Sequence, residues 1–152
     1  MTPASKLSLR GRALKYLAAR EHSRKELARK LAPHAQAPEQ VETLLDELEA
    51  KGLLSHERFV ESVVHRKAAR FGTARIRQEL HGHGLGPEQL RDALAQLQGT
   101  EYERARALWQ RRFGDAPPPA TPAERAKQMR FLAGRGFSAE VIRRVVRGTE
   151  DD

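Results

Sequence analysis

Histidines are the residues of this sequence best suited to metal or acid–base chemistry, but their spacing favours neither. His81 and His83 form a His-x-His pair, yet Gly82 between them marks a turn, and no third ligand follows at a metal-binding spacing. The other histidines are scattered, with no nucleophile motif nearby: His22, His34, His56 and His65. The chain has no cysteine, so disulfides, thiolate metal sites and cysteine nucleophiles are excluded.

Carboxylates are plentiful, but their placement suits solvent or a partner better than catalysis. Asp46, Glu47 and Glu49 fall on the outer side of an amphipathic helix, where paired acids seldom act as acid and base. Neither a GxxxxGK[S/T] loop nor a GxGxxG sequence is present to hold a nucleotide. We therefore predict a binding protein with no catalytic residue, no metal and no cofactor.

Lysine and arginine give the chain its main capacity to bind a partner. The net charge is +8 and the pI about 10.4, an excess that points to an anionic partner, most often nucleic acid, rather than to a surface that only keeps the protein in solution. Aromatic residues make up only 5%, so we expect contacts to phosphates without sequence readout rather than base stacking. The predicted contact residues are Arg24, Lys25, Arg29, Lys30, Arg66, Lys67, Arg70, Arg75, Arg77, Arg125, Lys127, Arg130, Arg135, Arg143, Arg144 and Arg147.

The charge alternates in blocks along the chain. Residues 1–35 hold nine basic and two acidic groups, residues 36–61 hold two and seven, and basic and acidic blocks continue to alternate to the end. A helix–turn–helix repressor is an alternative that this pattern disfavours. Two of the three helices that would enter a major groove are acidic or mixed, which suits DNA poorly.

The elements that must position these charges are helices throughout. Apolar residues recur at spacings of three and four, and no stretch alternates with period two. Ser23–Glu26, Thr100–Glu103 and Thr121–Glu124 have the capping-box form. Helices are predicted over 8–20, 24–33, 38–51, 56–70, 73–82, 87–97, 101–113, 122–134 and 139–147, with a proline-rich exposed loop over 114–121.

These helices form an internal repeat of three three-helix units. Leu31, Leu80 and Leu132 are each followed ten residues later by Val41, Leu90 and Ile142, which gives the register. The predicted units are 8–54, 55–98 and 100–148, followed by an acidic tail over 149–152, in an elongated, curved all-α array of helix–turn–helix-like repeats. One core position departs from the pattern: Leu27 and Ile76 correspond to Gln128, whose packing role we expect Met129 to take.

No apolar stretch resembles a signal peptide or a membrane-spanning helix, so the expected location is the cytoplasm. Nothing in the sequence indicates dimerisation, and a monomer is expected.

Four stretches in series resemble the RecX family of bacterial regulatory proteins: ALKYLAAREHSRKELARKL (13–31), LLDELEAKGLLSHERFVES (44–62), IRQELHGHGL (76–85) and FLAGRGFSAEVIRRVV (131–146). The resemblance spans about residues 9–147. It departs from the family at Ser55-His56, where an Asp pair is usual; Ser55 can still cap the next helix.

The resemblance implies three tandem three-helix units and a non-enzymatic modulator, usually an inhibitor, of the RecA recombinase. Such a protein binds the RecA–DNA filament, suppresses its ATPase, strand-exchange and co-protease activities, and so acts in DNA repair, recombination and the SOS response. Many members also bind single- or double-stranded DNA. The alternatives are a sequence-independent DNA-binding protein without a RecA partnership and a helical adaptor for another acidic protein.

Overall fold

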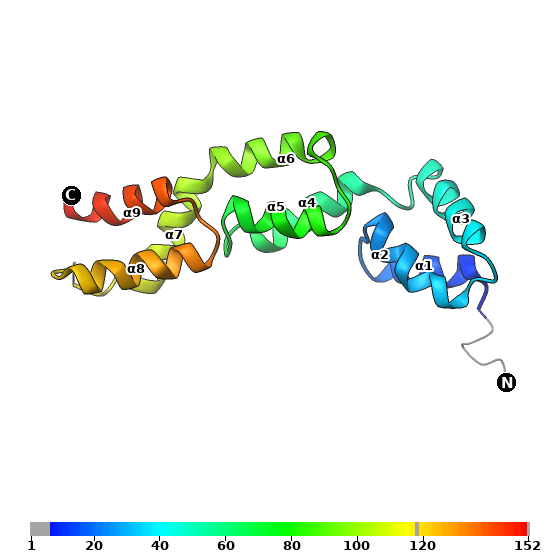
Figure 1. Cartoon of the computed structure of the whole chain (residues 1–152), viewed down its shortest axis with the longest axis horizontal. Helices are drawn as coiled ribbons and strands as arrows, with labels where there is room; N and C mark the ends of the chain where they lie inside the picture. The colour runs from blue at the N-terminus through cyan, green and yellow to red at the C-terminus, as the bar shows by residue number, and fades with distance from the viewer. Residues whose placement is uncertain (1–6, 118, 152) are drawn as a thin grey trace. The chain divides into compact units, whose positions relative to one another are not determined.

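The computed structural model describes residues 7–117 and 119–151, and all regular secondary structure in these ranges is helical, as predicted. The described α-helices are α1 (Leu9–Ala19), α2 (Arg24–Leu31), α3 (Pro38–Ala50), α4 (His56–Lys67), α5 (Thr73–Gly82), α6 (Pro87–Gly99), α7 (Glu101–Phe113), α8 (Pro122–Gly134) and α9 (Ala139–Asp151) (Figure 1). A short 3-10 helix, η2 (Ala32–His34), follows α2.

The ends of α1, α3 and α6 differ from the sequence prediction by one or two residues, and those of α2, α4 and α9 also differ. Helix α2 ends at Leu31 because Pro33 has no amide hydrogen and its ring clashes with the preceding helical turn. Helix α4 ends at Lys67 instead of residue 70, and the carbonyl groups of Ala68 and Ala69, which follow it, accept hydrogen bonds from Arg104 and Arg111 of α7. Helix α9 is longer than predicted and reaches Asp151.

Two of the three predicted helix caps are present. The hydroxyl oxygen of Ser23 accepts from the Glu26 amide at 3.1 Å, and that of Thr121 accepts from the Glu124 amide at 3.2 Å. The Thr100 prediction was wrong. Its side chain caps no amide, because its hydroxyl donates to the Gln96 carbonyl at 3.1 Å.

The described residues fall into two compact units, and the first reaches Ser62 and includes His83–Leu85. Its helices α1 and α3 both pack against α2. The buried apolar side chains of this unit form one core: Ala13, Leu27, Leu31, Val41, Leu44, Leu45, Leu48 and Leu54. After α3 the chain turns through Gly52 at φ +74°, so that the amides of Leu53 and Leu54 both donate to the Leu48 carbonyl.

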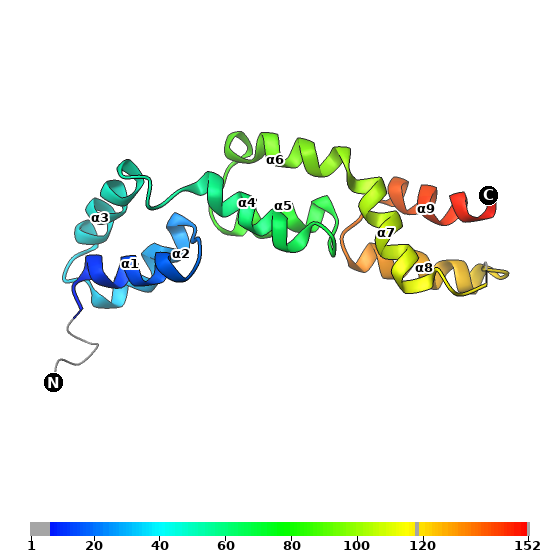
Figure 2. The same ribbon diagram turned by 180° about the vertical axis from the view of Figure 1, so that it is seen from behind.

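The second unit comprises Val63–Gly82 and continues from Gly86. Within it α7, α8 and α9 pack against one another, and Figures 1 and 2 both show α8 and α9 side by side. Gln128 remains in this core, only 6% exposed, because its amide oxygen accepts from the Trp109 indole nitrogen at 2.9 Å. A satisfied polar group thus occupies the position where the other repeats have Leu27 and Ile76.

Two turns of the second unit meet at the backbone. The Gly72 amide, in the turn between α4 and α5, donates to the Arg135 carbonyl at 2.8 Å, in the turn between α8 and α9. A Cβ atom on Gly72 would lie 2.2 Å from the Gly136 carbonyl oxygen, so the approach requires a residue without a side chain. Gly136 adopts φ +91°, which also favours glycine.

A buried glutamate and a half-buried arginine from α7 complete this turn–turn contact. The Glu101 carboxylate, 2% exposed, accepts from the Thr73 amide at 2.8 Å. The Arg104 guanidinium donates to the carbonyl groups of Ala68 at 2.8 Å, Phe71 at 2.6 Å and Leu97 at 2.8 Å. These bonds satisfy backbone groups that no helix could satisfy, and they hold the turn before α5 in place.

Replacing Gly72 with alanine is expected to destabilise the protein by about 1–3 kcal/mol, because the new methyl group overlaps the Gly136 carbonyl. The matched control is Gly99→Ala at the end of α6, where a Cβ meets nothing within 4 Å and alanine is the better helix former. Urea unfolding followed by circular dichroism measures both. Equal stability of the Gly72→Ala and Gly99→Ala variants would contradict the close approach.

Candidate nucleic-acid interface

In the first unit, Arg24 lies among carboxylates rather than offering a free cation. Its guanidinium forms ion pairs with Glu42 at 2.8 Å, Asp46 at 2.9 Å and Glu49 at 3.1 Å, all on α3. Helix α3 places these acids on one face because they are spaced by three and four residues. The positive charge of Arg24, a predicted phosphate contact, is thus already matched by three carboxylates. Arg24 is therefore not part of the proposed contact surface.

Lys30 of α2 also has partners within the first unit. Its ammonium lies 2.9 Å from Nε2 of His22 and 4.9 Å from the centre of the Tyr16 ring. His22 is 1% exposed, and its Nδ1 lies 3.1 Å from the Arg20 carbonyl oxygen. The neutral ring with a proton on Nδ1 fits both contacts, since Nδ1 then donates and Nε2 accepts. The two other predicted cations of α2, Lys25 and Arg29, are exposed.

Burial and neighbouring cations keep His22 neutral. Burial lowers the pKa of His22 below its ordinary value of 6.5, the hydrogen bond to the Arg20 carbonyl opposes this, and the charges of Arg20 and Lys30 lower it further. Glu26, which carries an ion pair to Arg20 at 2.5 Å, acts in the opposite direction on His22. The hydrogen bond from Arg20 lowers the pKa of Glu26 to about 2.

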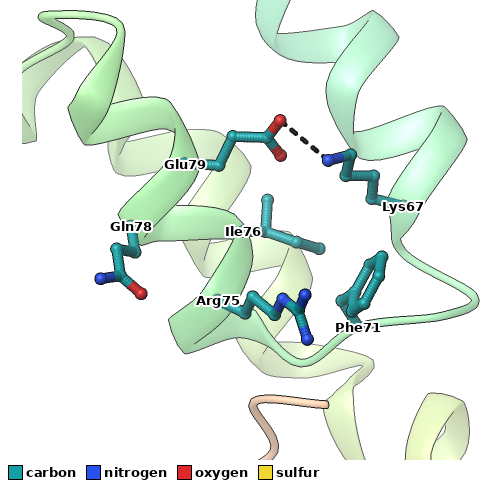
Figure 3. A pocket seen from close by; sticks show the side chains of 6 residues that line it. All are labelled: Lys67, Phe71, Arg75, Ile76, Gln78 and Glu79. Atoms are coloured by element: carbon teal, nitrogen blue, oxygen red, sulfur yellow. Dashed lines mark hydrogen bonds and ion pairs between the residues drawn. The ribbon is translucent and has the colours of Figure 1, made fainter. Parts of the chain in front are cut away.

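In the second unit, the predicted cations gather around Phe71. The guanidinium carbons of Arg75, Arg70 and Arg135 lie 4.2, 5.2 and 5.7 Å from the centre of its ring. Figure 3 shows the Arg75 guanidinium facing the Phe71 ring at one end of a shallow cavity of about 260 Å³, and the Lys67–Glu79 ion pair at the other. That ion pair measures 2.8 Å and accounts for the charge of Lys67.

The remaining predicted cations are spread over α4, α5, α8 and α9. Arg144 lies over the Tyr102 ring at 4.3 Å. Arg135 is the C-cap residue of α8 rather than part of the helix. Arg125 is half-buried, and the others are exposed: Arg66, Arg77, Lys127, Arg130, Arg143 and Arg147.

Sequence reasoning missed Arg104, Arg111 and Arg112 of α7. Arg104 and Arg111 bind backbone carbonyl groups within the second unit and have a structural role. Arg112 is exposed, and its guanidinium carbon lies 5.6 Å from the centre of the Phe113 ring and 5.7 Å from that of Phe131. The Arg-Arg-Phe sequence at the end of α7 was the available signal, but the contact with Phe131 comes from another helix.

Of the histidine pair, only His83 packs against other side chains. Its Nδ1 lies 2.7 Å from the Ser23 hydroxyl, and its ring centre lies 4.6 Å from that of Phe59 with the two rings tilted, whereas His81 is exposed. Over residues 7–117 and 119–151, no group of three or more His, Asp or Glu side chains is arranged to hold a metal ion. In the same ranges no helix is both long and apolar enough to cross a membrane.

Family models match the chain three times in tandem. They are the RecX first three-helix domain over residues 10–48, the second over 55–94 and the third over 100–146. The regulatory protein RecX of Leptothrix cholodnii is 63% identical over 93% of this chain and 88% of its own length. That of Ralstonia nicotianae is 57% identical over 97% and 92%. The crystal structure of RecX from Lactobacillus salivarius has the same fold, with a TM-score of 0.78 at 20% identity over 95% of this chain and 96% of that one.

The Arg24→Gln substitution is expected to lower the free energy of unfolding by roughly 0.5–1 kcal/mol, because it removes three ion pairs and leaves their carboxylates to repel one another. DNA affinity should stay within about twofold. Arg29→Gln on the same helix is the matched control, since Arg29 is exposed and has no ion-pair partner among the described residues. A larger loss of DNA affinity in Arg24→Gln than in Arg29→Gln would refute the structural role.

Stability should fall as the pH drops below about 6.5, the ordinary pKa of histidine, because the unfolded chain takes up a proton on His22 that the folded chain resists. His22→Gln, whose amide can donate to the Arg20 carbonyl and accept from Lys30, should flatten this part of the profile. Urea unfolding at a series of pH values measures the effect, with His34→Gln as an exposed control. Parallel profiles for the His22→Gln variant and the unaltered protein would argue against a buried neutral imidazole.

Proposed function

The chain belongs to the RecX family, and we propose that it is a non-enzymatic regulator that binds the RecA–DNA filament and inhibits RecA. The observation that carries this proposal is the tandem match of all three RecX domains, in order, over residues 10–146. Relatives that share more than half of its residues over nearly their whole length bear the name of a regulatory protein.

The two signs of surface charge suit a partner made of protein and DNA together. In the first unit, α3 sets the three exposed carboxylates of Glu42, Asp46 and Glu49 against the single Arg24, and this excess of negative charge can face basic protein surface. In the second unit, the exposed Arg70, Arg75 and Arg112 form no ion pair with a carboxylate of the described residues and can face phosphates. Many such contacts along a filament would bridge neighbouring RecA subunits and hinder the movements that ATP turnover and strand exchange require.

We expect this protein to suppress the DNA-dependent ATPase of RecA at sub-stoichiometric to equimolar concentration. The measurement is a titration of the protein into preformed filaments, with steady-state ATP hydrolysis as the readout. An unaffected rate over that range would refute the proposal. An unrelated basic protein of similar size serves as the control for charge alone.

A second function, binding DNA without a RecA partnership, is favoured by Arg70, Arg75 and Arg112, which form no ion pair with a carboxylate of the described residues. Excess single-stranded DNA separates the two. Inhibition by capture of DNA is relieved by added DNA, whereas inhibition through the filament persists. Fluorescence anisotropy with RecA filaments and with bare DNA gives an independent comparison, in which a preference for filaments supports the first function.

A further inference from the structure

A continuous row of alternating arginines and phenylalanines crosses the second unit. Arg75 of α5 lies 4.2 Å from the centre of the Phe71 ring, and Arg135 lies 5.7 Å from the same ring. Arg135 also lies 5.2 Å from the centre of Phe131, which Arg112 approaches to 5.7 Å. The row ends at Phe113, whose ring meets Phe131 edge-on at 5.5 Å. We call Arg75, Phe71, Arg135, Phe131, Arg112 and Phe113 the arginine–phenylalanine row.

The row concentrates positive charge without neutralising it. Among the described residues, no carboxylate forms an ion pair with Arg75, Arg112 or Arg135, and the nearby Glu79 is engaged by Lys67. Arg70, whose guanidinium lies 5.2 Å from the centre of Phe71 and forms no ion pair with a described carboxylate, is counted with the row. The ring faces attract these cations but carry no net charge, so repulsion between the arginines persists until an anion binds.

The backbone beneath the row is fixed before any partner arrives. Gly72 and Arg135 are joined by the backbone hydrogen bond that connects the two turns. The Arg75 guanidinium donates to the Gly134 carbonyl at 3.0 Å, which sets its position on the ring. Since the aromatic rings already hold the arginine side chains in place, binding an anion costs little further side-chain entropy.

We infer that this row is a contact site for the phosphodiester backbone of DNA. The inference rests on the proposed function and assigns it a surface. Planar guanidinium groups suit phosphate oxygens, which they bind through two parallel hydrogen bonds. A row of separate cations suits a polymer with a negative charge at every repeat.

Burial favours phosphate over an acidic protein surface as the partner. Protein interfaces are centred on apolar anchors, yet the large exposed apolar side chains of the described residues, Leu7 and Leu53, both lie in the first unit. The Phe71 ring is only 9% exposed beneath its arginines, so it offers bases no stacking surface. The contact is therefore with the backbone and independent of sequence.

The test is the double variant Arg70→Gln/Arg112→Gln. Both side chains are exposed and donate no hydrogen bond within the described part of the chain, so the turn–turn contact stays intact. Fluorescence anisotropy with a labelled oligothymidylate and a labelled duplex should show binding weakened by roughly tenfold at about 50 mM salt. The slope of log affinity against log salt should fall by about 1.5–2, since two phosphate contacts are lost.

The matched control is Arg91→Gln/Arg106→Gln, which removes the same charge from exposed positions that face no aromatic ring in the described structure. Its affinity should fall less than threefold or so, as expected for screened long-range charge. Equal losses in the two double variants, or no loss in the first, would overturn the inference. An unfolding temperature equal to that of the native protein shows that the first variant remains folded. If it does not, Arg70→Lys/Arg112→Lys replaces it, and its DNA affinity should lie between those of the native protein and the first variant.

This experiment contains no RecA, so its result is separate from that of the ATPase titration. If the row variant loses DNA binding and the native protein leaves the RecA ATPase rate unchanged, the row is supported as a DNA contact and the proposed function is refuted. If the native protein inhibits RecA and the row variant binds DNA as the native protein does, the row is refuted as a DNA contact and the proposed function stands. If the row variant binds bare DNA normally but no longer binds the filament, the row contacts RecA protein instead of DNA, which also overturns the inference.

Discussion

The hydrogen bond from the Gly72 amide to the Arg135 carbonyl is the contact on which the second unit depends. It brings together two turns that lie far apart in the sequence, and it forms only because neither Gly72 nor Gly136 has a side chain in the way. Glu101 and Arg104 accompany this contact, since they bind backbone groups of the turn before α5 that have no helical partner. The same contact places Arg135 between Phe71 and Phe131. The position of this arginine therefore depends on the backbone contact between the two turns.

Arginine has three different environments in this protein. Arg104 is surrounded by carbonyl groups, Arg24 by carboxylates, and Arg135 by aromatic rings. Carbonyl groups and carboxylates satisfy the guanidinium and leave little for a partner, whereas a ring orients it and leaves its hydrogen-bond donors available. A count of basic residues therefore overstates the charge that faces outward in the first unit.

Most of the helical framework could be predicted from sequence because its signals are local. Proline at the first turn of α3 and α6, the Ser23 cap and glycine in the turns all act within a few residues. Two of the failures were local: Pro33 ends α2 early, and the Thr100 hydroxyl turns back to the Gln96 carbonyl. A third occurred where distant residues take part, because arginines of α7 bind the carbonyl groups that follow α4.

The site was less predictable than the fold, for the same reason. The basic clusters near Phe71 were visible as sequence, but the acids that engage Arg24 come from the next helix, and the ring that Arg112 faces comes from α8. Spacing along one helix reports which side chains share a face, not what the neighbouring helix presents to them. Exposure alone does not separate a cation with a partner from one without.

The Trp109–Gln128 hydrogen bond, between residues nineteen apart, also couples two core positions of the third repeat. Leucine at position 128, the residue type of the first repeat, would leave the indole nitrogen without an acceptor in the core, and an apolar residue at position 109 would leave the Gln128 amide oxygen without its donor. Either substitution alone is therefore costly, whereas replacing both side chains together removes both polar groups. The core of the third repeat thus cannot take the side chains of the other repeats one position at a time.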